Sequence, residues 1–341
     1  MNRFPCAPGP LPSTPWPRRL LSWGNRTPLR LRHRLLERRG RIPCGRARRT
    51  PRQRGYTSIF PNYHLHTEHS YCCEDITTER IAEFAASWPY PLAITDHSAH
   101  VVFAPEMRGK FDSDLASSVF TEDREGARER TLRYLDQMRA RLGDGVLLGT
   151  ELDVLPDGRP VFPEDLLPRL DLIVGAVHAL AAVRHGESED AIRREWQAQN
   201  RALIAAGAHI IAHPFRYLIQ RRFPVTEEDV QWLVTEAHAS GIALELNSHY
   251  IIRSLDDLML RACLAEGVPI AIGTDAHRWT EIADFTYHAE VLSDHGLRTQ
   301  EERADRLYVA QVARRIEGAP GAGNRRDERS RTHVANATSR P

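Results

Sequence analysis

Short apolar runs recur along the chain, and each leads into a histidine or a carboxylate. The seven runs occupy residues 62–66, 92–97, 146–151, 173–178, 209–213, 242–247 and 270–277. Their length and aliphatic content are typical of buried β-strands. An unpaired charge or imidazole at the end of a buried strand would cost several kcal/mol. We therefore expect these strand ends to bind something, and a metal ion meets that need.

Segments with helical periodicity separate the runs. Thr77 is expected to cap a helix that buries Ile81 and Phe84. Capping boxes are expected at residues 226–229 and 254–257. Helices are predicted over residues 77–88, 121–142, 164–170, 189–206, 226–240, 254–266 and 299–316. This alternation predicts the α/β class and a seven-stranded parallel (β/α)7 barrel, with its chemistry at the carboxyl ends of the strands.

The barrel is expected to span residues 56–317. Residues 1–55 contain fifteen arginines, many prolines and a single acidic residue, Glu37. This composition predicts a disordered extension, with a transit peptide or a nucleic-acid-binding arm as alternative interpretations. Residues 318–341 are predicted to be a disordered tail. The long connection 99–120 is expected to influence substrate choice, because loops of this length are often functional.

Composition narrows the possible functions. The net charge is +1, but the chain after residue 55 has more acidic than basic residues, which argues against a broad polynucleotide track. The five cysteines are few and odd in number, which favours a reducing, cytoplasmic compartment. No apolar run approaches the roughly 20 residues that span a bilayer, so no membrane partner is expected.

Histidines and carboxylates gather at the predicted strand ends. His64 and His66 are two residues apart on a strand, so their side chains point to the same side, as in many metal sites. A lone histidine on an apolar strand is more often a satisfied core residue. That interpretation weakens when nine such residues occupy strand ends. The set comprises His64, His66, Asp96, His97, Glu151, His178, His213, Asp275 and His277.

Six short motifs, in this order, resemble those of the polymerase and histidinol phosphatase (PHP) superfamily. They are His64-Leu65-His66-Thr67, Thr95-Asp96-His97, Gly149-Thr150-Glu151, Val177-His178, His213-Pro214 and Thr274-Asp275-Ala276-His277. The resemblance implies a distorted seven-stranded barrel of the PHP type. It also implies two or three divalent metal ions that hydrolyse phosphoesters, and Zn, Mn or Fe suits the donor types.

The same resemblance assigns the ligands. The first metal would be bound by His64, His66, Glu151 and Asp275, and the second by Glu151, His178 and His213, with Glu151 as the bridge. The third would be bound by His97, His277 and a residue after the first strand.

At that last position several relatives have a histidine, and this chain has Cys72. This position has two interpretations: Cys72 binds the metal ion as a thiolate, or the Cys72-Cys73 pair only packs against its neighbours. His69, Cys73, Glu74 and Asp75 are nearby alternatives.

Further roles are expected around these ligands. Glu151, Asp275 and Asp96 are the candidate catalytic carboxylates, and Asp96 is expected to orient a ligand histidine. Arg216 and Arg184 are candidates for binding a substrate phosphate. Water between two metal ions would be the nucleophile, so no protein nucleophile is required.

The leading functional hypothesis is a metal-dependent phosphoesterase acting on a small phosphorylated metabolite or nucleotide. The alternatives are a non-catalytic metal-binding module and a nuclease acting on polynucleotide ends. An amidohydrolase is disfavoured because the only lysine, Lys110, lies in the long connection and not after a middle strand. The sequence does not indicate the oligomeric state.

Overall fold

The computed structural model describes residues 60–103, 123–143 and 145–310. The predicted extension 1–55 and tail 318–341 lie outside these ranges. Most of the long connection 99–120 lies outside them as well. Among its aromatic residues, Phe103 is described and is buried.

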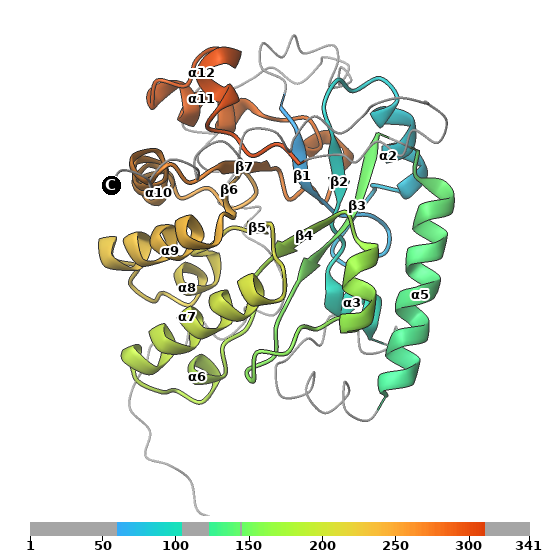
Figure 1. Ribbon diagram of the computed structural model, residues 1–341, viewed down its shortest axis with the longest axis horizontal. Helices are drawn as coiled ribbons and strands as arrows, with labels where there is room; N and C mark the ends of the chain where they lie inside the picture. Colours follow the sequence, from blue (N-terminus) through green and yellow to red (C-terminus); the bar gives the residue numbers. More distant parts are fainter. Residues whose placement is uncertain (1–59, 104–122, 144, 311–341) are drawn as a thin grey trace, which may run out of the picture. The chain divides into compact units, whose positions relative to one another are not determined.

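Seven parallel strands form one sheet in sequence order (Figure 1). They are β1 (Asn62–Leu65), β2 (Leu92–Ile94), β3 (Val146–Leu152), β4 (Leu172–Gly175), β5 (Ile210–Ile211), β6 (Ala243–Asn247) and β7 (Ile270–Gly273). A parallel bridge between Leu65 and Ala276 connects the two ends of the sheet. Two further hydrogen bonds join Asn62 and Thr274, at 2.7 and 3.1 Å. The strands thus form a nearly closed barrel, as predicted.

Helices follow most of the strands and surround the barrel (Figure 1). The longer ones are α2 (Thr78–Ala85), α5 (Arg124–Arg141), α7 (Glu189–Ala205), α9 (Glu227–Ser240), α10 (Arg253–Glu266) and α11 (Thr286–Asp294). The shorter ones are α3 (Ser98–Val102), α6 (Ala181–Arg184), α8 (Arg216–Gln220), α12 (Gln300–Ala304) and the 3₁₀ helices η3 (Glu164–Arg169) and η4 (Trp279–Glu281). No helix in the described ranges combines the length and apolar character needed to cross a bilayer.

The predicted caps explain several helix boundaries. The Thr77 side chain accepts a hydrogen bond from Arg80 N at the start of α2. Thr226 and Asp229 form a reciprocal capping box at α9. Gly241 and Gly267 end α9 and α10 with φ values of 66° and 73°, which glycine adopts without strain.

Two helix predictions are wrong in detail. Helix α10 begins at Arg253 without a side-chain cap. The Asp257 carboxylate instead accepts from Arg253 at 2.9 Å and lies 2.8 Å from His295. The last helix ends at Ala304 and does not continue toward residue 316, because the chain turns back to β7 through a parallel bridge between Ile270 and Leu307.

Alternation along the strands separates two apolar clusters. The larger lies between the strands and the helices and includes Leu148 and Leu244. The smaller takes at least one residue from every strand, including Ala93, Leu147 and Ala271, and fills the barrel interior. Continuing along β3 in steps of two from Leu147 leads to Glu151. The interior is therefore apolar at one end and ionisable at the carboxyl ends of the strands.

Candidate metal centre

Glu151 lies at the centre of the ionisable end of the barrel and is fully buried. Its Oε1 atom is 2.8 Å from His213 Nε2 and 3.1 Å from His178 Nε2. Its Oε2 atom is 2.6 Å from His97 Nδ1. One carboxylate thus faces imidazoles from different strands with each of its oxygens, which is the arrangement that a bridging ligand requires.

The other side of Glu151 Oε2 faces the pair from β1. His64 Nε2 lies 3.5 Å and His66 Nε2 3.6 Å from this oxygen. Asp275 Oδ1 lies 3.0 Å from His66 Nε2 and 3.7 Å from His64 Nε2. His277, two residues further on, places Nδ1 3.7 Å from the same Asp275 oxygen.

Two of these residues have unusual backbone conformations. His213 has φ = 25° and Asp275 has φ = 49°, in a region that non-glycine residues seldom occupy. Each lies two residues beyond the end of a short strand, where the chain turns to aim the side chain at Glu151 or His66. Strain of this kind, on the order of 1–3 kcal/mol, persists where the surroundings over-determine the geometry.

The residues present fit metal ions. His64 Nε2, His178 Nε2, Glu151 Oε2 and Asp275 Oδ2 are buried, and none of their contacts in the described ranges, the close imidazole–carboxylate contacts included, has hydrogen-bond geometry. Such atoms are costly unless another group satisfies them. Donor atoms lie within 4.8 Å of one another in several groups. These include His64–His66–Glu151, His64–His213–Asp275, His97–Glu151–His178, His66–His97–His277 and Cys72–His97–His100.

Mutual electrostatics hold the carboxylates ionised. Burial by itself raises the pKa of Glu151, but the imidazoles of His97, His178 and His64 outweigh it, so the pKa lies well below its usual value. Burial likewise opposes ionisation of Asp275, and His64 and His66 depress its pKa strongly. The ionised carboxylates attract cations, and bound metal ions would take the place of imidazole protons.

Two carboxylates behind the histidines were not assigned a role from the sequence. Asp153 Oδ1 lies 2.8 Å from His178 Nδ1. Glu245 Oε1 lies 2.8 Å from His64 Nδ1, and Glu245 Oε2 accepts from His213 N at 2.7 Å. Carboxylates in this position fix the tautomer and direction of a ligand imidazole. Their signal in the sequence is their position, since Asp153 is two residues beyond Glu151 and Glu245 is the carboxylate of the predicted strand 242–247.

Gly273 makes room for one of these carboxylates. A Cβ atom at this position would lie 1.8 Å from Glu245 Oε1 and 2.8 Å from His64 Cβ. Only glycine therefore lets β7 pass this close to the Glu245–His64 pair. The sequence motif places a glycine there but does not say which side chains need the space.

Asp96, which is expected to orient a ligand histidine, forms no direct hydrogen bond to an imidazole in the described ranges. Its carboxylate accepts from Thr67 N at 2.8 Å, Thr67 Oγ1 at 2.7 Å, Ser70 Oγ at 2.7 Å and Tyr134 OH at 3.1 Å. Ser70 Oγ in turn lies 3.2 Å from His66 Nδ1. Asp96 thus reaches the histidine through Ser70 and holds the turn after β1.

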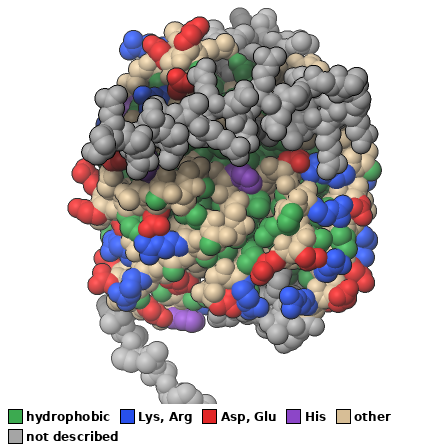
Figure 2. Space-filling model, viewed as in Figure 1, with side chains coloured by type: hydrophobic (Ala, Val, Ile, Leu, Met, Phe, Trp, Pro, Cys, Tyr) green, Lys and Arg blue, Asp and Glu red, His purple; other side chains and the backbone are tan. Residues whose placement is uncertain are grey.

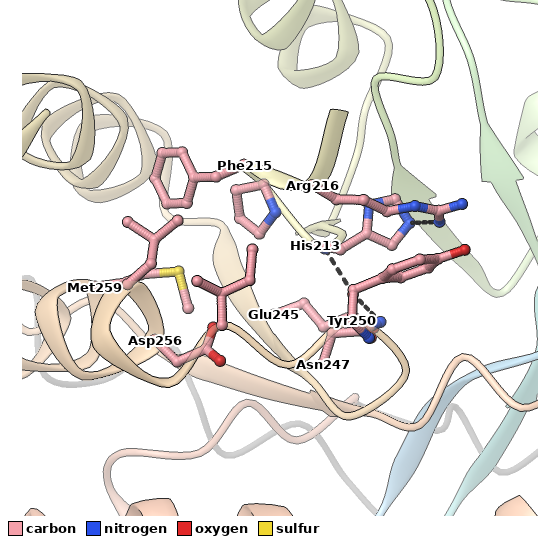
Figure 3. Close-up of a pocket in the computed structure, with 11 residues that line it drawn as sticks. His213, Phe215, Arg216, Glu245, Asn247, Tyr250, Asp256 and Met259 are labelled. Carbon is pink, nitrogen blue, oxygen red and sulfur yellow. Dashed lines mark hydrogen bonds between the residues drawn. The ribbon is translucent and has the colours of Figure 1, made fainter. Parts of the chain in front are cut away.

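The two candidate arginines lie in different places. Arg216, at the start of α8, places NH1 3.2 Å from His213 Nε2 and 3.6 Å from Asp275 Oδ2. Its guanidinium lies over the Tyr250 ring, 3.8 Å from the centroid. Figure 3 shows Arg216, Tyr250 and His213 together at the edge of a small pocket. Arg184 ends α6 and is exposed.

The residues named as alternatives to Cys72 for binding the third metal ion contact other groups. Glu74 pairs with Arg278 at 2.5 Å, and Asp75 accepts from Trp279 N at 2.6 Å. His69 packs edge-on against Tyr134. The Cys73 thiol lies against backbone carbonyls, at 3.4 Å from Ile76 O. Cys72 is the residue of this segment that lies with His97 and His100.

The described residues define a class of protein, namely a parallel β/α barrel with an imidazole and carboxylate metal-binding site at the carboxyl ends of its strands. The PHP domain pattern matches residues 62–249, more than half of the chain. The chain belongs to the PHP domain family, as the six motifs predicted.

Several curated proteins are similar over part of this region. The DNA polymerase/3′-5′ exonuclease PolX of Bacillus subtilis is 28% identical over 187 residues, 54% of this chain and 29% of the relative. A probable phosphatase of Syntrophotalea carbinolica is 26% identical over 169 residues, 47% of this chain and 64% of the relative. A probable phosphatase of Caldicellulosiruptor bescii is 31% identical over 147 residues, 40% and 55% respectively. These matches span less than two thirds of each relative.

One solved structure that aligns with this chain is a histidinol phosphate phosphatase from Lactococcus lactis in complex with zinc, L-histidinol and phosphate. It aligns with a TM-score of 0.43 and 14% identity, and covers 69% of this chain and 93% of its own.

Proposed function

We propose that this protein hydrolyses phosphate esters with two to three divalent metal ions at the carboxyl ends of the barrel strands. The observation that carries the proposal is Glu151, whose two oxygens face separate groups of imidazoles. The proposed ligands of the metal ions are those named from the sequence motifs. They are His64, His66, Glu151 and Asp275 for one ion, and Glu151, His178 and His213 for the second.

Metal ions in such a site supply Lewis acidity and lower the pKa of water. The chain's own residues do the rest. Asp153 and Glu245 hold His178 and His64 in the orientation for binding. The ionised Glu151 and Asp275 balance the positive charge. Arg216, whose guanidinium lies over the Tyr250 ring, presents a planar fork that matches phosphate oxygens.

The donor set suits Zn, Mn or Fe, because imidazoles and carboxylates are all acceptable to these ions. The proposed substrate is a small phosphorylated metabolite or nucleotide. On the described part of the face shown in Figure 2, basic and acidic side chains are interspersed, and no continuous stripe of basic side chains is visible there. A long polynucleotide track requires such a basic stripe. The similarity to PolX keeps hydrolysis of polynucleotide ends as the second candidate.

The test uses the full chain loaded with Zn, Mn or Fe, an aryl phosphate and a panel of phosphorylated metabolites. We expect metal-dependent phosphate release that a chelator abolishes and added metal restores. A single-stranded DNA substrate in the same assay tests the nuclease alternative. A nuclease would cleave the DNA faster than it hydrolyses the metabolites. Protein that binds metal and releases phosphate from no substrate would support a non-catalytic module and contradict the proposal.

A further inference from the structure

The turn after β1 places two adjacent cysteines in different surroundings. Ser70 N donates to Thr67 O and Cys73 N donates to Ser70 O, each at 2.9 Å, which fixes the turn. The Cys73 thiol lies 3.4 Å from Ile76 O and 3.7 Å from His66 O, within reach to donate to these carbonyls. Cys72 Sγ instead lies within 4.8 Å of a ring nitrogen of His97 and one of His100. Of the pair, Cys72 faces nitrogen donors.

His100 is a residue that the sequence motifs did not single out. It is 4% exposed, and its Nδ1 atom has no hydrogen-bond partner in the described ranges. It lies on α3, three residues after His97, which is the N-cap residue of this helix, and residues at this spacing lie on the same side of a helix. The two ring centroids lie 4.6 Å apart. A buried imidazole with one unpartnered nitrogen, grouped with a thiol and a second imidazole whose donor atoms lie within 4.8 Å of one another, points to a ligand that binds all three.

We propose that Cys72, His97 and His100 form a mixed sulfur and nitrogen site for a zinc-like divalent cation. The proposal rests on the proposed metal centre and assigns the residues of its third ion. Binding replaces the Cys72 S–H bond with a bond from sulfur to the cation, and the proton goes to solvent. One thiolate and two imidazoles favour Zn²⁺, Co²⁺ or Fe²⁺ over Mg²⁺, which prefers oxygen ligands.

A competing set lies close by. His66, His97 and His277 also place one nitrogen each within 4.8 Å of one another. His97 belongs to both sets, so the two assignments differ in Cys72 and His100 on one side and in His66 and His277 on the other. Sulfur makes them distinguishable by spectroscopy, because only the first set gives the ion a thiolate.

The experiment loads the full chain with Co²⁺ and records its absorption spectrum during titration. We expect a near-ultraviolet band from thiolate-to-cobalt charge transfer in the unchanged protein. Cys72→Ser should abolish the band, and Cys73→Ser, the matched control, should keep it. His100→Gln should weaken Co²⁺ affinity at this site by roughly tenfold or more, since loss of a direct ligand costs at least as much as loss of an outer partner.

Three outcomes would overturn the proposal. The first is the absence of the band in unchanged protein that holds three metal equivalents. The second is a band that survives Cys72→Ser. The third is full affinity in His100→Gln with loss of the ion in His277→Gln. Thermal melting of the metal-free variants checks that they fold. If His100→Gln does not fold, the test rests on the spectrum of Cys72→Ser, which is nearly isosteric with the unchanged protein. The Co²⁺ spectrum does not depend on phosphate release. A failed phosphoesterase assay would therefore contradict the proposed function but not the site at Cys72, His97 and His100.

Discussion

At the scale of single residues, Glu151 connects the largest number of proposed ligands. Substitution by glutamine keeps its volume but removes the charge that balances two cations. For Glu151→Gln we expect turnover to fall by on the order of 10² or more, by analogy with loss of a principal electrostatic group. Folding should suffer less, because the core consists of the apolar residues of the strands and helices.

The measurement is phosphate release together with metal content by elemental analysis. Glu83→Gln, on the exposed side of α2, is the control and should change neither. If Glu151→Gln binds metal normally and hydrolyses substrate at a near-normal rate, Glu151 is not the bridge.

Gly273 offers a second test at this scale, because a methyl group there would displace Glu245 from His64. For Gly273→Ala we expect metal affinity to fall by about 10–100-fold, the usual cost of losing an outer-shell partner. Gly145→Ala is the control, since its nearest atoms would lie at an ordinary 3.7 Å. Metal titration by calorimetry compares the two. Equal affinities would show that the Glu245 carboxylate is not needed to orient His64.

At the scale of elements, α11 supports the strands that carry the site. His288 on this helix is fully buried, and its Nε2 atom lies 3.0 Å from Leu246 O on β6 and 3.2 Å from Gly273 O on β7. Donation to both carbonyls holds the two strand ends together just before Asn247 and Asp275. The helix was not predicted from the sequence, because its polar and apolar residues do not form a clear periodic stripe.

Burial lowers the pKa of His288 from 6.5 to about 4, which outweighs its hydrogen bonds to the two carbonyls. The folded state therefore keeps His288 neutral while the unfolded chain takes up a proton below pH 6.5. Its contribution to stability is complete above pH 6.5 and is lost as the pH falls toward 4, by on the order of 3 kcal/mol.

Urea unfolding of metal-free protein across this pH range is the measurement. His288→Gln does not titrate, so its disadvantage relative to the unchanged protein should shrink as the pH falls from 6.5 to 4. A difference in unfolding free energy that stays constant with pH would contradict the assigned role of His288.

At the scale of the whole molecule, ionisable groups from all parts of the barrel are buried at one end. Ions that bind the folded chain and not the unfolded chain stabilise it by about 2.7 kcal/mol each at a hundredfold excess over Kd. For a domain of this size that corresponds to a rise in Tm of roughly 5–10 °C for each ion.

We therefore expect elemental analysis to show two to three metal equivalents for each chain, as the ligand set of the resemblance predicts. Differential scanning calorimetry should show a fall in Tm on chelation that the same metal reverses. Protein that contains no metal after reconstitution, or melts at one temperature with and without it, would contradict the metal centre.

The sequence by itself determined the seven strands, most of the long helices and the family. Strand runs with ionisable ends and capped helical segments are local signals, and parallel βαβ connections leave few arrangements for them. The same signals brought the histidines and carboxylates to one end of the barrel, because parallel strands all end on one side. Local signals failed where a long-range contact decided the outcome. Examples are the early end of α12, which Leu307 sets by returning to β7, and the uncapped start of α10.

Only the tertiary structure decided which atoms meet. The direction of a side chain and the space around it depend on residues more than a hundred positions away, as with Glu245 beside His64 and Gly273. The choice between Cys72 and Cys73 is of the same kind, since the two thiols are neighbours in sequence and one turn of the backbone sends them to different partners. The φ angles of His213 and Asp275 likewise follow from the surrounding contacts, because no local preference favours them.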